Sequence, residues 1–219
     1  MKRACIWRLA AAGGIAAGLY RLVVRPWFLS WGSTNEERGG RLAGDDLTPE
    51  SNYVTTRAVT IQAPAGSVWP WLVQMGQDRA GFYTHNWVER TLRSGIPDVS
   101  EIHPEWQHIE VGDLVRTNRD IGGKPLGWPV VAVEPDRSLV LRSRSMPTGT
   151  YAFVLEAIDA FSTRLIVRDR AHWKRWQWPF AALLYEPLHA YMETGLINGL
   201  KRRAENRSTA TALPTCGGR

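Results

Sequence analysis

The sequence predicts an α+β fold in which an antiparallel β-sheet wraps around a long C-terminal α-helix, with two short helices after the first strand. Three observations carry this prediction. A segment rich in Val, Thr and Ile, typical of a strand, is followed at once by two short helical segments. Several further β-like segments follow, and two of the connections between them are of hairpin length, which only antiparallel neighbours allow. An amphipathic helical pattern then closes the chain.

The elements are predicted in this order. The first strand covers residues 53–62 and ends at Ala63-Pro64. Residues 67–73 form a short helix, whose length is limited by Pro70, and residues 85–93 form the second. Five more strands are predicted at 113–117, 129–133, 138–143, 150–158 and 163–172.

Alternation along the strands predicts one apolar face and one charged face. Leu139 and Leu141 share the apolar face, whereas Arg168 and its alternate neighbours lie on the other. The apolar face needs a cover, and apolar residues at three- and four-residue steps over 180–200 predict a helix that supplies it. Pro187 should kink or restart this helix. The side chains expected to face the sheet are Leu184, Leu188, Met192 and Leu196.

The end of the first strand carries a family resemblance. Ile61, Ala63, Pro64, Val68, Trp69 and Leu72 resemble the signature at this point of the SRPBCC superfamily, which includes START lipid-transfer domains and polyketide cyclase-like proteins. Shorter matches resemble an uncharacterised, membrane-anchored bacterial branch. The resemblance covers about residues 31–207 and implies a START-like helix-grip fold around an apolar cavity. It implies no single activity, because members of the superfamily bind lipids, polyketides or hormones.

The chain is expected to divide into four parts: an N-terminal membrane anchor and interfacial segment (1–31), a lead-in loop (32–52), the helix-grip domain (53–207) and a disordered tail (208–219). Residues 5–24 are long enough to cross a bilayer as one helix. Arg8 and Arg21 interrupt them near the ends, where arginines can reach the headgroups. A single-span anchor is the preferred interpretation, with its side of the membrane unknown. A cleaved signal peptide and an amphipathic start without a membrane role are the alternatives.

The charge distribution argues against a nucleic-acid partner. Residues 1–41 and 168–219 each carry a net charge of +5, whereas residues 42–167 carry −4. A nucleic-acid domain should present a basic face from its own fold, and here the folded middle is acidic. Basic ends beside tryptophans suit anionic membrane lipid, with solubilising charge as the alternative.

Seven residues are expected at a membrane interface: Trp27, Trp31, Trp173, Lys174, Arg175, Trp176 and Trp178. Tryptophan favours the headgroup level, where its ring is buried and its N–H stays wet, and the basic residues gain from anionic lipid. We expect both segments to lie on one bilayer surface. The alternative is that these tryptophans close the cavity from inside.

Candidate cavity residues come from the inner face of the predicted sheet and from the loops beside it. Arg57 and Asp169 should meet there as an ion pair, because the first and last strands of this fold are neighbours and a buried charge needs a partner. The pair either fixes the register or anchors a ligand. The aromatic candidates for the cavity wall are Tyr83, Trp87, Trp106, Trp128, Tyr151 and Phe153.

No catalytic residue, metal site or cofactor is predicted. The chain has no nucleophile motif, and its two cysteines, Cys5 and Cys216, form no CxxC pair. His103 and His108 do not have the spacing of a structural zinc site.

Three hypotheses of function follow. The preferred one is a membrane-associated binder of a lipophilic small molecule, without covalent catalysis. The second is a cyclase- or dehydratase-like enzyme in which Arg57, Asp169 or Tyr151 polarises a carbonyl, and the third is a protein-interaction module. An open apolar cavity favours the binder, converging polar groups in the cavity favour the enzyme, and a filled core favours the module.

Overall fold

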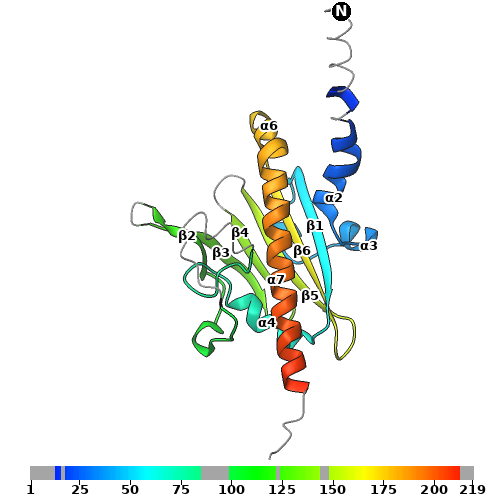
Figure 1. The fold of residues 1–219 in the computed structure, drawn as a ribbon. Helices are drawn as coiled ribbons and strands as arrows, with labels where there is room; N and C mark the ends of the chain where they lie inside the picture. Colours follow the sequence, from blue (N-terminus) through cyan, green and yellow to red (C-terminus); the bar gives the residue numbers. More distant parts are fainter. Residues whose placement is uncertain (1–12, 16–17, 85–98, 122–123, 144–147, 213–219) are drawn as a thin grey trace, which may run out of the picture.

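The computed structural model describes residues 13–15, 18–84, 99–121, 124–143 and 148–212 (Figure 1). Its strands are β1 (Tyr53–Ile61), β2 (Leu114–Ile121), β3 (Lys124–Glu134), β4 (Ser138–Ser143), β5 (Thr148–Ala157) and β6 (Thr163–His172). The longer helical elements are η1 (Tyr20–Val24), α2 (Arg25–Ser30), α3 (Asn35–Gly39), α4 (Ala65–Val73), η5 (Ala181–Tyr185) and α7 (Glu186–Ala212). Short turns are η2 (Asp45–Leu47), η3 (Pro104–Trp106), η4 (Arg175–Gln177) and α6 (Trp178–Phe180).

The six strands form one antiparallel sheet in the order β1-β6-β5-β4-β3-β2. The first and last strands are therefore neighbours, as predicted, and Thr55 lies opposite Asp169 in their register. The predicted limits of β4 and β6 agree with the structure, and the other strands differ at their ends. The predicted helix at 85–93 lies outside the described residues.

The family-like motif joins β1 to α4 and anchors both in the core. Ile61, Ala63 and Val68 are fully buried, and Leu72 is 1% exposed. Pro64 precedes the helix in an extended conformation, which suits a residue that cannot donate a backbone hydrogen bond. This corner fixes α4 against the end of the sheet.

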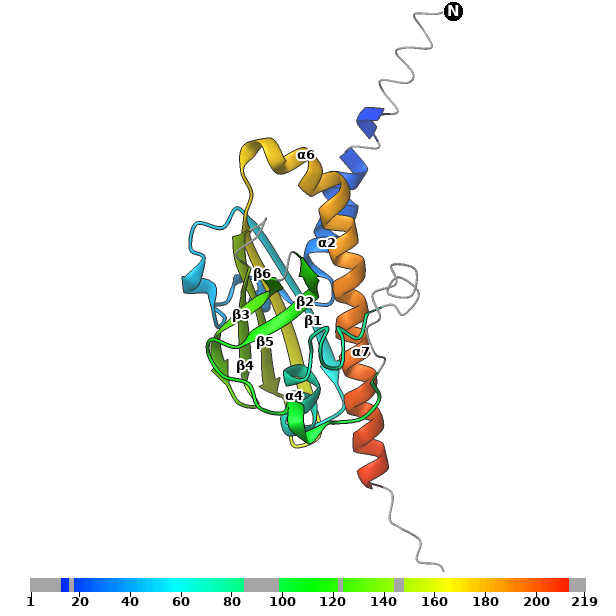
Figure 2. The ribbon, with the colours of Figure 1, turned by 90° about the vertical axis from the view of Figure 1, so that its left-hand side faces the viewer.

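Helix α7 runs across the inner face of the sheet (Figures 1 and 2). Leu196 faces the core as expected, together with Ile197, Leu200 and Ala204. The expectation was wrong for three other side chains: Leu184 is 55% exposed, Leu188 49% and Met192 39%. In the first half of the helix the buried side carries instead Ala181, Glu186, Ala190 and Glu193.

Two features of the helix explain this difference. Residues 181–185 form a π-helix, in which the Glu186 N–H bonds to the Ala181 carbonyl, five residues back, so a uniform helical period misplaces Leu184. Leu188 and Met192 lie after this turn on the regular helix, where each step of four residues rotates the side chain by about 40°, so they lie progressively farther from the face of Leu196. Pro187 follows in the first turn of α7, where the predicted restart falls.

The N-terminal helix packs against the domain. Helix α2 lies beside β1 and α7 (Figure 1). Within the described residues, no helix has both the length and the apolar character that crossing a membrane requires. The predicted membrane span at 5–24 is therefore wrong. The physical reason is that Tyr20 donates a hydrogen bond to the Ala182 carbonyl and Arg25 donates to the Glu186 carboxylate, so these residues pack against protein.

The N-terminal and C-terminal helices contact each other at two turns that have the same local structure. In each, a π-helical turn is followed by a charged residue and a proline, Arg25-Pro26 in one and Glu186-Pro187 in the other. Pro187 has no N–H to give to the Ala182 carbonyl, and the Tyr20 hydroxyl donates to that carbonyl at 2.8 Å instead. Arg25 Nη2 pairs with Glu186 Oε1 at 2.9 Å. The two helices therefore satisfy each other's polar groups.

Replacing Arg25 with methionine should destabilise the domain by about 1–3 kcal/mol, because the side chain of Glu186 is fully buried and loses its cation. The lower part of this range allows for the 30% exposure of Arg25. Urea unfolding measures the effect, and Arg21→Met, an exposed arginine one turn earlier, is the matched control. Equal midpoints for the two variants would show that the N-terminal helix does not hold Glu186.

The lead-in segment covers the outer face of the sheet, on the side away from α7 (Figure 2). Arg168, expected on an exposed face, is only 2% exposed. It pairs with Asp45 at 2.7 Å and donates to the carbonyls of Glu37, Arg38 and Gly40. Charged residues on this face therefore fasten the segment before β1 to the sheet.

Candidate functional site

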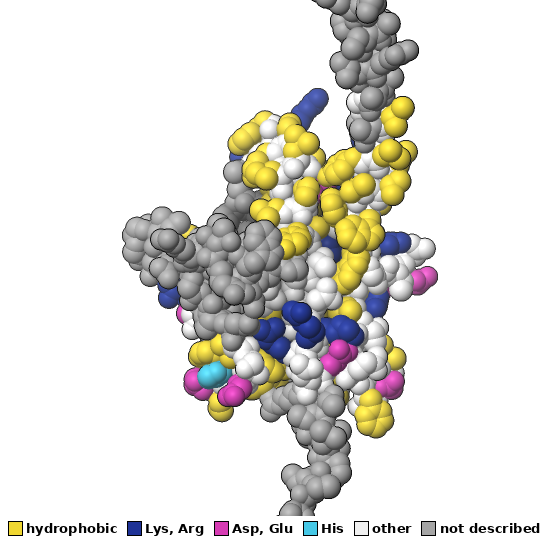
Figure 3. Space-filling model, in the orientation of Figure 1, with side chains coloured by type: hydrophobic (Ala, Val, Ile, Leu, Met, Phe, Trp, Pro, Cys, Tyr) yellow, Lys and Arg dark blue, Asp and Glu magenta, His cyan; other side chains and the backbone are white. Residues whose placement is uncertain are grey.

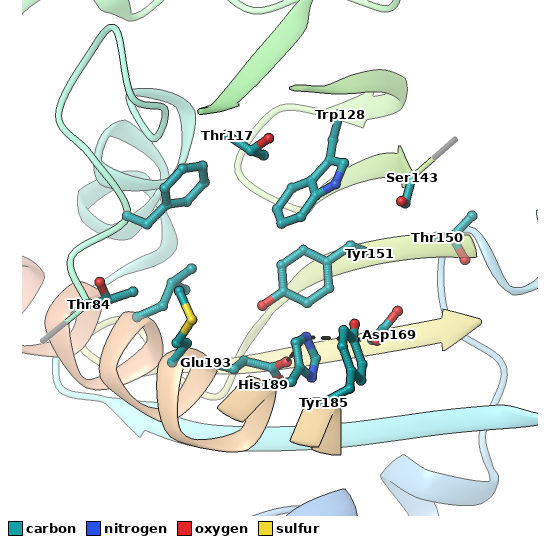
Figure 4. Close-up of a pocket in the computed structure, with 13 residues that line it drawn as sticks. Thr84, Thr117, Trp128, Ser143, Thr150, Tyr151, Asp169, Tyr185, His189 and Glu193 are labelled. Carbon is teal, nitrogen blue, oxygen red and sulfur yellow. Dashed lines mark ion pairs between the residues drawn. The ribbon is translucent and has the colours of Figure 1, made fainter. Parts of the chain in front are cut away.

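A cavity of about 340 Å³ lies between the inner face of the sheet and the first half of α7 (Figure 4). It exists because the helix presents small and polar side chains there, whereas farther along the helix Ile197, Leu200 and Ala204 fill the space with buried apolar side chains. The lining residues are Phe82, Thr84, Thr117, Trp128, Ser143, Thr150, Tyr151, Asp169, Tyr185, His189, Met192, Glu193 and Leu196.

One side of the cavity is aromatic. The ring of Trp128 meets that of Tyr151 edge-on at 5.6 Å between centroids, and Phe82 meets Trp128 at 6.0 Å. Behind Tyr151, Phe153 packs edge-on at 4.7 Å. Edge-on contacts hold each ring in a defined orientation. These rings form a fixed wall that suits an apolar or flat molecule.

Polar groups converge on the other side, where α7 meets β6 (Figure 4). His189 Nε2 lies 3.3 Å from Glu193 Oε2 and 3.8 Å from Asp169 Oδ2. The Tyr185 side chain forms a hydrogen bond with Asp169, and its ring stacks on His189 at 5.0 Å. The side chains of Asp169 and Glu193 are 10% and 1% exposed. The cavity is therefore polar at this end.

Arg57 lies behind this cluster and does not line the cavity. Its Nη1 pairs with Glu193 Oε2 at 2.7 Å, and its Nε donates to the Phe28 carbonyl at 2.8 Å. The predicted partner was Asp169, which lies opposite Thr55, two residues from Arg57 along β1. The expected ion pair of Arg57 and Asp169 is replaced by one with Glu193, because α7 brings a carboxylate closer.

Burial shifts the pKa values of the cluster in opposite directions. Desolvation, and then the nearby Glu193 carboxylate, raise the pKa of Asp169 to about 8. Desolvation lowers the pKa of His189 to about 4. Burial likewise raises the pKa of the Tyr151 and Tyr185 hydroxyls. At neutral pH these shifts favour a protonated Asp169 beside a neutral His189.

The predicted cavity residues fall into three groups. Trp128, Tyr151 and Asp169 line the cavity. Tyr83 and Phe153 belong to the core, where the Tyr83 hydroxyl donates to the Trp71 carbonyl at 2.9 Å. Trp106 packs partly buried against that core and stacks on His103. Trp87 lies outside the described residues.

Some of the residues predicted at a membrane interface are buried in the structure, and the others are exposed. Trp173 is 1% exposed and packs with Tyr53, Ala171 and Ala181, so its ring lies inside the domain. Trp178 packs partly buried on the same cluster, and Trp31 packs on the main core.

The other interface residues are exposed. Trp27 is 55% exposed and Trp176 72%, and Lys174 and Arg175 are exposed too. Figure 3 shows hydrophobic side chains gathered at this end of the molecule, on the N-terminal helix and on the first part of the C-terminal one. Contact of these residues with membrane lipid stays a prediction.

Sequence reasoning missed Tyr185, His189 and Glu193. They follow one another at four-residue steps, so all three share one side of the helix. That spacing was available as a signal, but apolar residues alone were used to orient the helix. Among the described residues, no group of three or more histidine, cysteine, aspartate or glutamate side chains is arranged to hold a metal ion.

Comparison with known proteins finds similar structures and no matching sequence. No family model matches the chain, and no curated protein sequence does. Among solved structures, the chain is similar to a Polyketide_cyc-like protein from Corynebacterium glutamicum, with 12% identity and a TM-score of 0.42 over 75% of this chain and 97% of that one. It is also similar to protein NE0264 from Nitrosomonas europaea, with 15% identity and a TM-score of 0.45 over 71% and 96% of the two chains.

A third similar structure is the Aha1 dimer from Colwellia psychrerythraea, with 14% identity and a TM-score of 0.38 over 68% of this chain and 96% of that one. At these identities and TM-scores, the similarities carry no argument about the family or activity of this chain. The predicted helix-grip fold is confirmed by the structure itself, through the strand order of its antiparallel sheet and the long closing helix.

Proposed function

We propose that this protein binds a small molecule that has an apolar, partly flat body and one polar end. The observation that carries the proposal is the division of the cavity into an aromatic wall and a buried polar cluster. A volume of about 340 Å³ falls within the range of small-molecule sites. The rings of Trp128 and Tyr151 would hold the body, while Asp169, His189 and Glu193 would orient the polar end.

A second candidate is acid–base catalysis of the cyclase or dehydratase kind, which converging polar groups favour. At neutral pH, Asp169 with a pKa of about 8 can donate a proton, and His189 with a pKa of about 4 can accept one. Asp169 would donate its proton to a substrate carbonyl oxygen while His189 takes a proton from the adjacent carbon. The electron pair of that C–H bond forms the C=C bond of an enol, and the electron pair of the C=O π bond takes up the proton from Asp169. The enol can then expel a β-hydroxyl group, which leaves as water with the proton from His189, or attack a second carbonyl group of the substrate to close a ring.

Filling the cavity tests the binding proposal. Met192 lines the cavity and is 39% exposed, so Met192→Trp should occupy the space without breaking the core. We expect the wild-type protein to bind the neutral fluorophore N-phenyl-1-naphthylamine with a blue-shifted emission, and Met192→Trp to bind it at least about tenfold more weakly. Leu188→Trp, on the exposed side of the same helix, is the matched control. Equal binding by both variants, or none by the wild type, would contradict the proposal.

Mass spectrometry separates the two candidates. The protein is incubated with small-molecule extracts, and the molecules that it retains are released by denaturation. A compound recovered unchanged supports the binder. A compound recovered as an isomer, or lighter by one water, supports acid–base catalysis, provided that His189→Leu abolishes the conversion.

A further inference from the structure

When Asp169 is ionised, the charges that face the cavity do not balance. Two carboxylates, Asp169 and Glu193, line it, and the histidine beside them is held neutral by burial. The only cation that pairs with the cluster among the described residues is Arg57, which lies behind Glu193 and outside the cavity lining. One arginine can neutralise one carboxylate, so the second is left without a positive partner.

Among the described residues, acceptor oxygens of this cluster also lack hydrogen-bond donors. Within the described residues, Asp169 Oδ2 and Glu193 Oε1 are buried and accept no hydrogen bond. Buried polar atoms are nearly always paired, so those left unpaired in a cavity mark where a ligand can supply the missing donor. Both oxygens belong to side chains that are nine-tenths or more buried and that point into the cavity (Figure 4).

The surroundings favour a positive donor over a neutral one. The rings of Tyr151 and Tyr185 line the cavity together with that of Trp128, and aromatic faces attract cations. A protonated amine offers three donors and a positive charge, which suits two acceptor oxygens on separate carboxylates better than a hydroxyl does.

We propose that the ligand of this cavity carries a protonated amine, which lies between Asp169 and Glu193 while its apolar body packs on Trp128 and Tyr151. This inference rests on the proposed binding function and names the chemical class of the ligand. Its consequence is that binding moves a proton. Asp169 must ionise to hold an ammonium group, so its proton leaves to solvent when the amine binds.

The sign of the pH dependence follows from the groups around Asp169. Below a pKa of about 8 the empty site holds this carboxyl protonated, so the amine must displace a proton and binds more weakly as pH falls. Between about pH 6.5 and about pH 8.5, affinity should rise roughly 25-fold, while an aliphatic amine stays charged throughout. The titratable and charged groups that face Asp169 are Tyr53 and Arg57 from β1, Tyr151 from β5, Tyr185 from η5, and His189 and Glu193 from α7.

Two probes of the same shape test the proposal: 2-(2-naphthyl)ethylamine and the neutral 2-(2-naphthyl)ethanol, titrated by calorimetry against the full-length protein. At about pH 8.5 the amine should bind roughly tenfold or more tightly than the alcohol. Repeating the titration at about pH 6.5 in two buffers of different ionisation enthalpy should reveal close to one proton released per amine and none per alcohol.

Asp169→Asn keeps the shape of the protonated side chain and removes the proton. It should abolish both the preference for the amine and the proton release, while binding of the alcohol stays unchanged. Glu156→Gln, which removes an exposed carboxylate from β5, is the matched control and should behave as the wild type. Equal affinity for both probes, with no proton released, overturns the amine assignment and leaves the binding function intact. Binding of neither probe overturns the binding function itself.

Discussion

Ile197→Asp should unfold the domain, whereas Leu188→Asp should change its stability by less than about 1 kcal/mol. Ile197 is fully buried in the main core, so its replacement would place a carboxylate there without a partner. That cost is several kcal/mol, comparable with the whole stability of an ordinary domain. Leu188 is 49% exposed, so an aspartate at this position can keep its carboxylate in water.

Circular dichroism during thermal unfolding measures both variants, and Leu188→Ala controls for the loss of the leucine itself. The two aspartates are nine residues apart on one helix, so helix propensity affects them alike. If Leu188→Asp were the variant that unfolds, the first half of α7 would face the sheet as the apolar pattern predicts, and the cavity would not exist as described.

The helix face could be predicted from the sequence only where the helix fills space. Leu196 and Leu200 follow the apolar period and are buried. Before them, the buried positions hold Glu186, His189 and Glu193, because this part of the helix borders the cavity and neutralises Arg25 and Arg57. An apolar periodicity cannot identify a face whose function requires polar groups.

The strands were more predictable than the site. Alternation and turn residues are local, and they placed β4 and β6 at their observed limits. The partner of Arg57 depends on where a helix more than a hundred residues later crosses the sheet, and no local pattern carries that information. Asp169 and Tyr151 could be predicted as cavity residues because their strand positions alone decide which way they point.

The incorrect prediction of a membrane span has the same cause, because local composition carries no information on contacts with distant segments. The composition of residues 5–24 suits a bilayer, but Tyr20 in this segment bonds to Ala182 of η5, and Arg25 just after it pairs with Glu186 of α7. Tyr20 and Arg25 bond to groups that a π-helical turn and a proline leave available, and such turns have no sequence signature beyond the proline itself. Contacts with a distant part of the chain therefore determine where Tyr20 and Arg25 lie.

Substitutions at two adjacent residues of β6 should have opposite effects on the stability of the protein. Arg168→Gln should destabilise the protein by several kcal/mol, because it removes the closest cation from the mostly buried Asp45 carboxylate and the guanidinium donors from three backbone carbonyls. Asp169→Asn should be neutral or stabilising at neutral pH. The pattern of the strand alone suggests the reverse, with the charged outer face tolerant and the inner one sensitive.

The pH dependence of stability distinguishes the effect of burying Asp169 from the effect of removing any charged side chain. Its pKa is about 8 in the folded protein against 3.8 as the ordinary value, so the folded state holds a proton that the unfolded state releases. Wild-type stability should therefore fall as pH rises from about 4 to about 8, by up to roughly 1.4 kcal/mol per pH unit from this group. In Asp169→Asn that component disappears, whereas Arg168→Gln retains it. Urea unfolding at about pH 5 and about pH 8 measures the difference, and parallel losses in wild type and Asp169→Asn would mean that Asp169 is ionised in the folded cavity.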